Sequence, residues 1–210
     1  MIITHTAGPV VTHTGCIAFD LNDTLFPTGA CVRALTERMY ANKIFSLPTH
    51  VDAYEITKLL LKYNQITQSE YDSIMYTAHI QSMSMPYTHV VQYIQSLIQT
   101  DVHFVTSRKI AYDHAQIHSI LSSLFTTKIV HVHNPGTHVD THGGFIASNL
   151  AKKDILTQLY NMHNIRMFVD DLPFLHKDLK AIGIDLVLMS QPWSDSMCVR
   201  THTVVEYKCA

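Results

Sequence analysis

CIAFDLNDT, residues 16–24, is the stretch of this 210-residue chain that decides the fold. Its first four residues are apolar and predict a short buried strand, which the polar residues from Asp20 to Thr24 end in a turn. In parallel sheets, ligand sites gather at the carboxyl ends of the strands. Asp20 therefore stands where a catalytic or metal-binding carboxylate is expected.

Further short apolar runs repeat this pattern along the chain. They span residues 102–105, 128–132, 166–169 and 184–189. Amphipathic helical patterns fill the gaps at residues 87–99, 111–124, 152–162 and 173–182. Pro173 suits a first helical turn, and Gly183 reads as a helix stop. Alternating strands and helices predict an α/β fold, Rossmann-like and three-layered, with a mainly parallel sheet.

The segment 27–85 has a different pattern. It shows helical spacing at residues 32–40, 53–63 and 70–79 and contains no strong strand. We therefore predict an α/β core made of residues 1–26 and 86–210, interrupted by a helical insertion over residues 27–85. An insertion that leaves the end of the first strand would lie over the expected site as a lid.

The composition predicts a globular protein. The chain is 47% hydrophobic and 15% charged, and its net charge of −2 provides no basic field for a nucleic-acid or membrane partner. The four cysteines are scattered, so we expect no disulfide framework. The first residues lack the basic flank and apolar run of a signal peptide, and no apolar run reaches about 18 residues. We expect a cytoplasmic protein.

Polar side chains follow several of the predicted strands. Thr106 and Ser107 follow the second, and Asp170 and Asp171 follow the fourth. Carboxylate oxygens are ligands that Mg²⁺ prefers. A carboxylate such as Asp20 can also attack phosphorus, while a hydroxyl and a lysine hold the phosphate oxygens. The strand ends thus favour phosphoryl chemistry.

Four segments, in chain order, resemble the motifs of the haloacid dehalogenase (HAD) superfamily. They are IAFDLNDTLF, HFVTSR, AKKDILTQL and RMFVDDLPF. Together they extend from residue 16 to residue 174, and the insertion lies where the family's small helical C1-type cap lies. The resemblance implies a HAD core with a C1-type cap and Mg²⁺-dependent hydrolysis of a phosphate monoester.

The resemblance also implies roles for individual residues. Asp20 would be the nucleophile and a Mg²⁺ ligand. Asn22 would give its backbone carbonyl to the metal and occupy the position of the general acid/base. Thr106 would bind a phosphoryl oxygen. Asp170 would ligate Mg²⁺, with Asp171 as a second acidic partner.

The catalytic lysine is Lys152 or Lys153. We prefer Lys152, because leucines follow it at helical offsets of four and seven residues. The remaining residues near the phosphate are expected to bind it or to shape the loop. They are Asp23, Thr24, Ser107, Arg108 and Lys153.

Asn22 departs from the family pattern, which has a carboxylic acid at this position. An amide has no proton to exchange near neutral pH, and loss of general acid/base help costs about 10²–10⁴-fold in rate. Several explanations stay open. The chain is an engineered substrate trap, a natural phosphatase that uses a good leaving group or an acid from the cap, a HAD enzyme of another reaction class, or a pseudoenzyme that binds a phosphorylated ligand.

The substrate class is open between a nucleotide and another small phosphate ester. The segment SQPWS, residues 190–194, resembles a late QPxN-type loop of the 5′(3′)-deoxyribonucleotidases, with Ser194 in place of the usual Asn. The aromatic residues of the insertion could stack on a base, but their helical spacing favours packing. The resemblance also leaves a homodimer open.

Histidines offer an alternative metal site. The chain contains 15 histidines, and His131, His133, His138 and His142 lie close together in the sequence. HxH places two imidazoles on one face of a strand, which raises the hypothesis of a zinc-dependent hydrolase. No cysteine or carboxylate at a matching spacing completes a tetrahedral site, so a His-rich surface strand and loop is favoured.

Overall fold

The computed structural model describes residues 15–40, 53–107, 114–134, 144–190 and 206–208. Several predicted features lie outside these ranges, namely Arg108, His138, His142 and the loop at residues 191–194. Among the described residues, no helix is long and apolar enough to cross a membrane.

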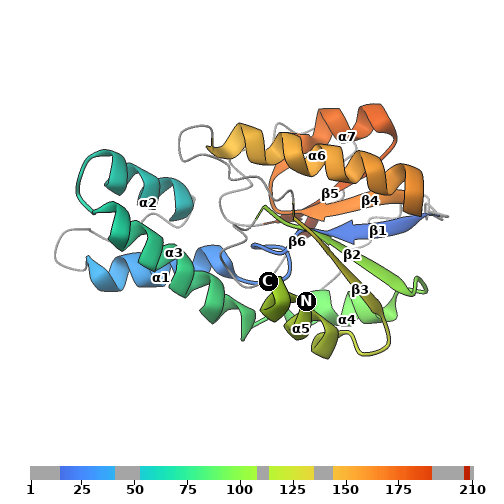
Figure 1. Ribbon diagram of the computed structural model, residues 1–210, viewed down its shortest axis with the longest axis horizontal. Coiled ribbons are helices and arrows are strands. Elements are labelled where there is room, and N and C mark those ends of the chain that lie inside the picture. The colour runs from blue at the N-terminus through green and yellow to red at the C-terminus, as the bar shows by residue number, and fades with distance from the viewer. Residues whose placement is uncertain (1–14, 41–52, 108–113, 135–143, 191–205, 209–210) are drawn as a thin grey trace.

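A six-stranded sheet forms the centre of the molecule (Figure 1). Its strands are β1 (Cys16–Phe19), β2 (Asp101–Val105), β3 (Ile129–His133), β4 (Ile165–Asp170), β5 (Asp185–Ser190) and β6 (Glu206–Lys208). The strand order is β3-β2-β1-β4-β5-β6, and every neighbouring pair is parallel. The chain builds outward from β1 to β3 and then returns to add β4 beside β1. The strand order therefore reverses between β1 and β4, which is where open α/β sheets bind ligands.

Helices cover both faces of this sheet (Figure 1). They are α4 (Thr88–Ser96), α5 (His114–Leu124), α6 (Gly144–His163) and α7 (His176–Ile182), with a 3₁₀ turn at Pro173–Leu175 before α7. One apolar core joins the sheet to α4 and α5, and a second joins it to α6 and α7. The predicted three-layer α/β fold with a parallel sheet is confirmed.

Alternate residues of the strands contribute their side chains to the two cores. In β2, Phe104 faces the α4 and α5 side, where its ring lies 6.1 Å from that of Phe19 and 5.7 Å from that of Phe125. The next residue, Val105, belongs to the opposite core with Leu156 of α6. Successive strand residues point to opposite faces, so both faces of this sheet are buried.

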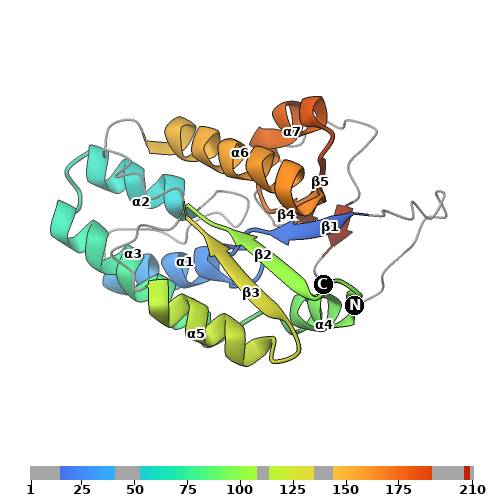
Figure 2. The same cartoon turned by 45° about the vertical axis from the view of Figure 1, so that its right-hand side comes forward.

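Three helices between β1 and β2 form a separate group (Figures 1 and 2). They are α1 (Thr28–Met39), α2 (Ala53–Lys62) and α3 (Gln68–Met83). They share a small core of their own, which includes Val32 and Ile74, and a capping box between Thr67 and Glu70 begins α3. These helices fall within the predicted insertion at residues 27–85, and its exact boundaries stay a prediction.

The structure corrects two sequence expectations about element boundaries. Helix α6 begins at Gly144, so Lys152 lies within the helix and does not open it as the 152–162 pattern predicted. Strand β6 was not predicted, because three residues give too short a pattern. The stop at Gly183 is confirmed: this residue ends α7 in the left-handed region with a φ of 84°.

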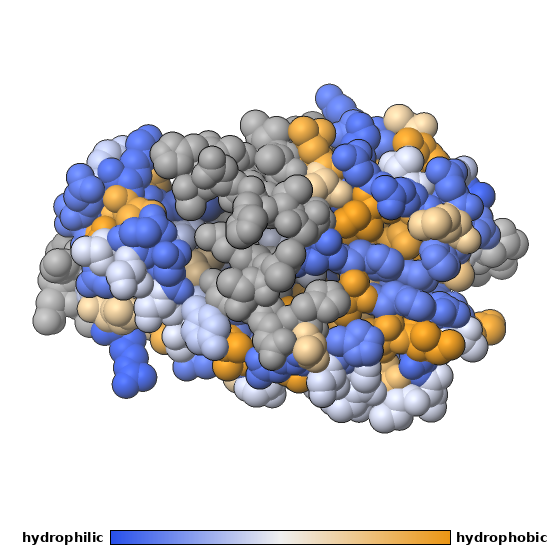
Figure 3. Space-filling model, in the orientation of Figure 1, coloured by the Kyte–Doolittle hydropathy of each residue, from blue (hydrophilic) through white to orange (hydrophobic). Residues whose placement is uncertain are grey.

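The distribution of hydropathy on the visible surface is the one expected for amphipathic helices that bury their apolar faces. In Figure 3 the described residues present mostly hydrophilic side chains, with apolar ones in small patches between them. Most large apolar side chains of the described residues are in the cores, as expected for a globular domain.

Candidate active site

The candidate site lies at the carboxyl ends of β1 and β4. Phe19 pairs with Val169 in the parallel register, and the backbone N–H of Asp20 donates to the carbonyl of Val169 at 2.8 Å. Asp170 is the last residue of β4. The sheet therefore places Asp20 and Asp170 side by side at the point where the strand order reverses.

Three carboxylates meet at this edge. One oxygen from each of Asp20, Asp170 and Asp171 lies within 4.8 Å of the others, and all three residues are buried. Burial, reinforced by the nearby carboxylates of Asp170, Asp23 and Asp20, raises the pKa of Asp171 well above its ordinary value. Buried like charges are unfavourable unless a cation balances them, so this all-oxygen set fits a hard divalent ion such as Mg²⁺.

Lys152 supplies a positive charge within this group. Its Nζ lies 2.8 Å from Asp20 Oδ1 and 3.1 Å from Asp170 Oδ2, and the residue is only 4% exposed. Burial lowers the pKa of Lys152, but the carboxylates of Asp170 and Asp20 outweigh burial and raise it above its ordinary value. The side chain is therefore an ammonium that bridges the two acids.

Asp20 has a raised pKa. Burial raises its pKa to about 6, while the Lys152 ammonium opposes this rise and the Asp170 carboxylate adds to it. Lys153 points elsewhere and contacts Asp178 at 3.2 Å. Of the two candidate lysines, the structure brings Lys152 to Asp20.

The loop after Asp20 is held by its own backbone and by Asp23. The N–H groups of Leu25 and Phe26 donate to the carbonyl of Leu21, and Asp23 takes a positive φ of 54°. Both carboxylate oxygens of Asp23 accept from the N–H of Gly29, at 2.8 and 3.1 Å. Asp23 thus binds the start of α1.

The side chain of Asn22 is linked through Thr28 to helices α1 and α3. Thr28 Oγ1 donates to Asn22 Oδ1 at 3.2 Å, and the Thr28 hydroxyl also lies 3.1 Å from Ser82 Oγ of α3. Thr28 and Ser82 could not be predicted as part of the site, since lone hydroxyl residues in helices carry no motif. This chain of contacts links the loop of the expected nucleophile to the last turn of α3.

The remaining predicted residues are placed as follows. Thr106 is buried directly after β2, where its N–H donates to the carbonyl of His133 at 3.0 Å. Ser107 is exposed. Thr24 is fully buried, and its hydroxyl has no hydrogen-bond partner among the described residues.

Of the predicted histidine site, His131 and His133 lie in the described part of the chain, whereas His138 and His142 lie outside it. His131 and His133 of β3 lie with His103 of β2 and His163 of α6, and the His103 ring lies 4.6–5.2 Å from the other three. Strand alternation places His103 on the same face as His131, a signal available in the sequence, whereas the position of His163 depends on the tertiary packing of α6. We refer to these four residues as the histidine cluster.

Two members of the histidine cluster, His103 and His133, have lowered pKa values. Burial, together with the neighbouring histidines, lowers the pKa of His103 and of His133 to about 4. Among the described residues, three potential metal ligands whose donor atoms lie within 4.8 Å of one another are found at Asp20, Asp170 and Asp171. The rings of His103, His131 and His133 stack on one another and do not converge on a common point in this way. The structure therefore gives a catalytic zinc site no assembled ligand set in the described part of the chain.

Comparisons with known proteins agree on the fold. No protein-family model and no curated protein matches the sequence. Among solved structures, a predicted phosphoglycolate phosphatase from Haemophilus somnus superposes with a TM-score of 0.52 at 12% identity, covering 86% of this chain and 87% of that one. A similarly assigned protein from Lactobacillus plantarum gives 0.51 at 16% identity, covering 91% and 92%.

A third structure carries ligands. A HAD-family hydrolase from Deinococcus radiodurans, with bound phosphate and sodium, superposes with a TM-score of 0.51 at 12% identity over 84% of this chain and 83% of that one. The chain therefore has the α/β fold of the HAD superfamily, as its four motifs predicted.

Proposed function

We propose that this protein is a Mg²⁺-dependent phosphatase that hydrolyses small phosphate monoesters through an aspartyl-phosphate. The observation that carries the proposal is the buried contact of Lys152 with Asp20 and Asp170, next to Asp171, at the reversal point of a HAD-type sheet. A buried cation between two carboxylates, beside a third, suits binding and transfer of an anionic phosphoryl group.

Mg²⁺ would be held by Asp20, Asp170, Asp171 and the backbone carbonyl of Asn22, and it would neutralise charge on the phosphoryl group. Lys152 is placed to hold a phosphoryl oxygen as well, since its ammonium already contacts Asp20. The Thr106 hydroxyl, at the end of the neighbouring strand, would donate to another oxygen.

In the first step, an Asp20 carboxylate oxygen attacks phosphorus. A new P–O bond to Asp20 forms, the ester P–O bond breaks, and the alcohol leaves with the electron pair as an alkoxide that takes up a proton. In the second step, water attacks the same phosphorus, the bond to Asp20 breaks, and inorganic phosphate and the free carboxylate are released. Lys152 stays protonated throughout and stabilises the charge.

Asn22 determines which substrates can turn over. Its amide cannot donate the proton that an alkoxide needs, nor accept one from the attacking water. Its contact with Thr28 still lets it position groups by hydrogen bonding. We infer that the chain favours leaving groups that need little protonation, which an aryl phosphate satisfies and an alkyl phosphate does not.

The fold likeness to proteins assigned as phosphoglycolate phosphatases supports a small phosphorylated substrate. A nucleotide is the finer proposal, supported by the sequence segment at residues 190–194 alone. A panel of nucleotides and sugar phosphates with the Asn22→Asp variant would separate these classes.

An aryl phosphate assay with Mg²⁺ tests the proposal. We expect release of the phenol by the chain, loss of activity in Asp20→Ala, and loss on removal of Mg²⁺. Absence of activity in both the chain and its Asn22→Asp variant would overturn it. The second candidate, a protein that binds a phosphorylated ligand without hydrolysing it, is favoured by Asn22 and would then be indicated by calorimetric binding of inorganic phosphate.

A further inference from the structure

The loop after Asp20 fixes the backbone of Asn22 but not the direction of its side chain. The backbone of Asn22 forms a β-bridge with Phe26, whose N–H donates to the carbonyl of Leu21 at 2.9 Å. The terminal torsion of an asparagine side chain is soft, so a neighbouring group has to orient the amide. Its direction decides whether the amide oxygen or the NH₂ group faces a bound substrate.

Two buried hydroxyl groups reach this amide from helices α1 and α3, which lie side by side (Figures 1 and 2). Thr28, the first residue of α1, donates from Oγ1 to Asn22 Oδ1 at 3.2 Å. Ser82, in the last turn of α3, places its Oγ 3.1 Å from Thr28 Oγ1. Thr28 and Ser82 are fully buried, whereas Asn22 is partly exposed. The contacts thus run from the interior between two helices to the amide that follows Asp20.

The number of protons limits the direction of these hydrogen bonds. A hydroxyl carries one proton, so a Thr28 hydroxyl that donates to Asn22 can only accept from Ser82. Ser82 can donate either to Thr28 or to the carbonyl of His79, which lies 3.0 Å away, and both arrangements leave the Thr28 proton directed at Asn22. The amide oxygen is then held towards α1, and the NH₂ group points away from it.

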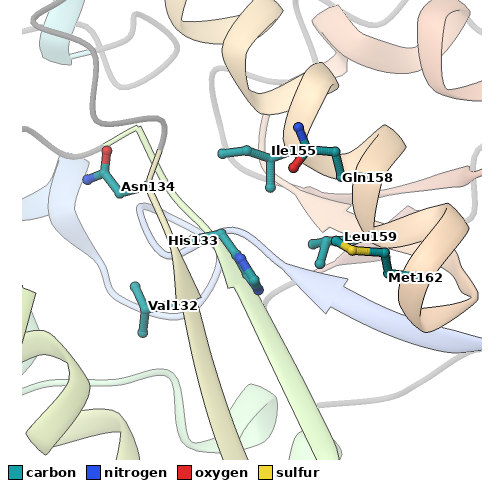
Figure 4. A pocket seen from close by; sticks show the side chains of 7 residues that line it. All are labelled: Val132, His133, Asn134, Ile155, Gln158, Leu159 and Met162. Carbon is teal, nitrogen blue, oxygen red and sulfur yellow. The ribbon is translucent and has the colours of Figure 1, made fainter.

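The hydroxyl pair of Thr28 and Ser82 is not placed to bind a ligand directly. A cavity of about 440 Å³ lies between the end of β3 and α6, and its lining residues come from these two segments (Figure 4). Neither Thr28 nor Ser82 is among them. Because both side chains are fully buried, they reach a substrate only through Asn22.

We propose that Thr28 and Ser82 are positioning residues, which hold the amide of Asn22 so that its NH₂ group donates to the leaving-group oxygen of the phosphate ester. This role rests on the phosphatase function proposed above. A fixed donor stabilises the charge that develops on this oxygen, although an amide transfers no proton to it. Since Thr28 belongs to α1 and Ser82 to α3, the orientation of Asn22 depends on how these two helices pack.

A second buried hydroxyl pair provides a matched control. Thr36 Oγ1 of α1 lies 3.2 Å from Thr57 Oγ1 of α2, and both residues are fully buried. Thr36→Val and Thr28→Val therefore remove the same kind of group from the same helix, but of the two threonines it is Thr28 that donates to Asn22. A purely structural role of these hydroxyls predicts similar effects of the two substitutions.

Steady-state hydrolysis of an aryl phosphate in the presence of Mg²⁺ tests the positioning role. Thr28→Val should lower kcat about 2- to 10-fold, the effect of one hydrogen bond, with little change in KM, because the contact is made to transition-state charge. Ser82→Ala should lower kcat less, since Thr28 keeps its proton. Thr28→Ser retains the hydroxyl and should retain kcat, and Thr36→Val should leave kcat nearly unchanged.

A double-mutant cycle asks whether Thr28 acts through Asn22. In the Asn22→Ala background the amide is absent, so Thr28→Val should lower kcat no further. An equal loss in both backgrounds would overturn the proposal, and so would a loss in Thr36→Val as large as that in Thr28→Val. Thermal melts of every variant verify that the measured chains are folded.

Failure of this inference and failure of the phosphatase function give different results. Inactivity of both the chain and its Asn22→Asp variant would remove the reaction and the positioning role with it. An active chain whose kcat does not respond to Thr28→Val would keep the phosphatase and overturn the positioning role alone.

Discussion

The ammonium of Lys152 contacts the carboxylate of Asp20 at 2.8 Å, whereas the adjacent Lys153 contacts Asp178 of α7 at 3.2 Å. Two neighbouring lysines thus serve different parts of the molecule, because successive helical residues point about 100° apart. Leu156 and Leu159 of the same helix are buried against the sheet, and Lys152 shares their face.

This pair provides a matched test. We expect Lys152→Met to lower kcat/KM for an aryl phosphate by about 10²–10³-fold, the usual effect of removing a group that stabilises transition-state charge. Lys153→Met should stay within a few-fold of the unmodified chain. Circular dichroism would verify that both variants fold. Comparable losses in the two variants would contradict the role assigned to Lys152.

Features that depend on local sequence patterns could be predicted from the sequence. The alternation of strands and helices predicted the parallel sheet, because apolar periods are local features of a sequence. The site residues that the four motifs suggest stay predictions. Leucines at helical offsets favoured Lys152, and the structure places this lysine beside Asp20 and Lys153 beside Asp178; the catalytic role of Lys152 stays a prediction. The start of α6 was predicted too late, because the 144–151 segment has no strong apolar period while the tertiary structure continues the helix there.

Contacts between distant segments could not be predicted in the same way. Thr28 and Ser82 are 54 residues apart and meet only when α1 packs against α3. His163 meets His103 only because α6 packs over β2 on one face of the sheet. Such contacts depend on the packing of whole elements, for which one sequence carries no periodic signal.

Asn22 gives the second prediction. Asn22→Asp restores a group that can exchange a proton, so we expect activity to increase by about 10²–10⁴-fold on an alkyl phosphate and by much less on an aryl phosphate. Steady-state rates on the two esters measure this difference. Asn22→Ala serves as control, since it also removes the amide but supplies no acid. An equal gain on both esters would exclude a proton-transfer role for position 22.

Gly29 gives the third prediction. A Cβ atom at this residue would lie 2.8 Å from Asp23 Oδ2, a distance that real Cβ atoms essentially never show. Gly29→Ala should therefore displace Asp23 and the loop after Asp20, with a loss of about 1–3 kcal/mol in the free energy of unfolding. Ala30→Ser, at the exposed next position of α1, is the control. Urea denaturation measures both, and unchanged stability in Gly29→Ala would show that the loop adapts.

The histidine cluster gives a prediction about stability at low pH, in the presence of a chelator. Burial and neighbouring histidines lower the pKa of His103 and of His133 from 6.5 to about 4. Between these values the unfolded chain binds protons that the folded chain does not. The free energy of unfolding therefore decreases as the pH falls from about 6.5 to about 4.

Variants isolate this contribution from that of Asp20 and Asp171 in the candidate site. The raised pKa values of Asp20 and Asp171 act in the opposite direction, because the folded state binds protons more readily there. His133→Gln should reduce the loss of stability on acidification relative to His176→Gln, since it removes one depressed group and one neighbour of His103. A shift of one pKa unit corresponds to about 1.4 kcal/mol in the free energy of unfolding. Because His133 is partly exposed, solvent screening makes its contribution smaller than this. Urea denaturation at pH 7 and pH 5 measures the difference. Parallel pH profiles for the two variants would mean that the cluster is protonated in the folded state and that its burial does not hold the rings neutral.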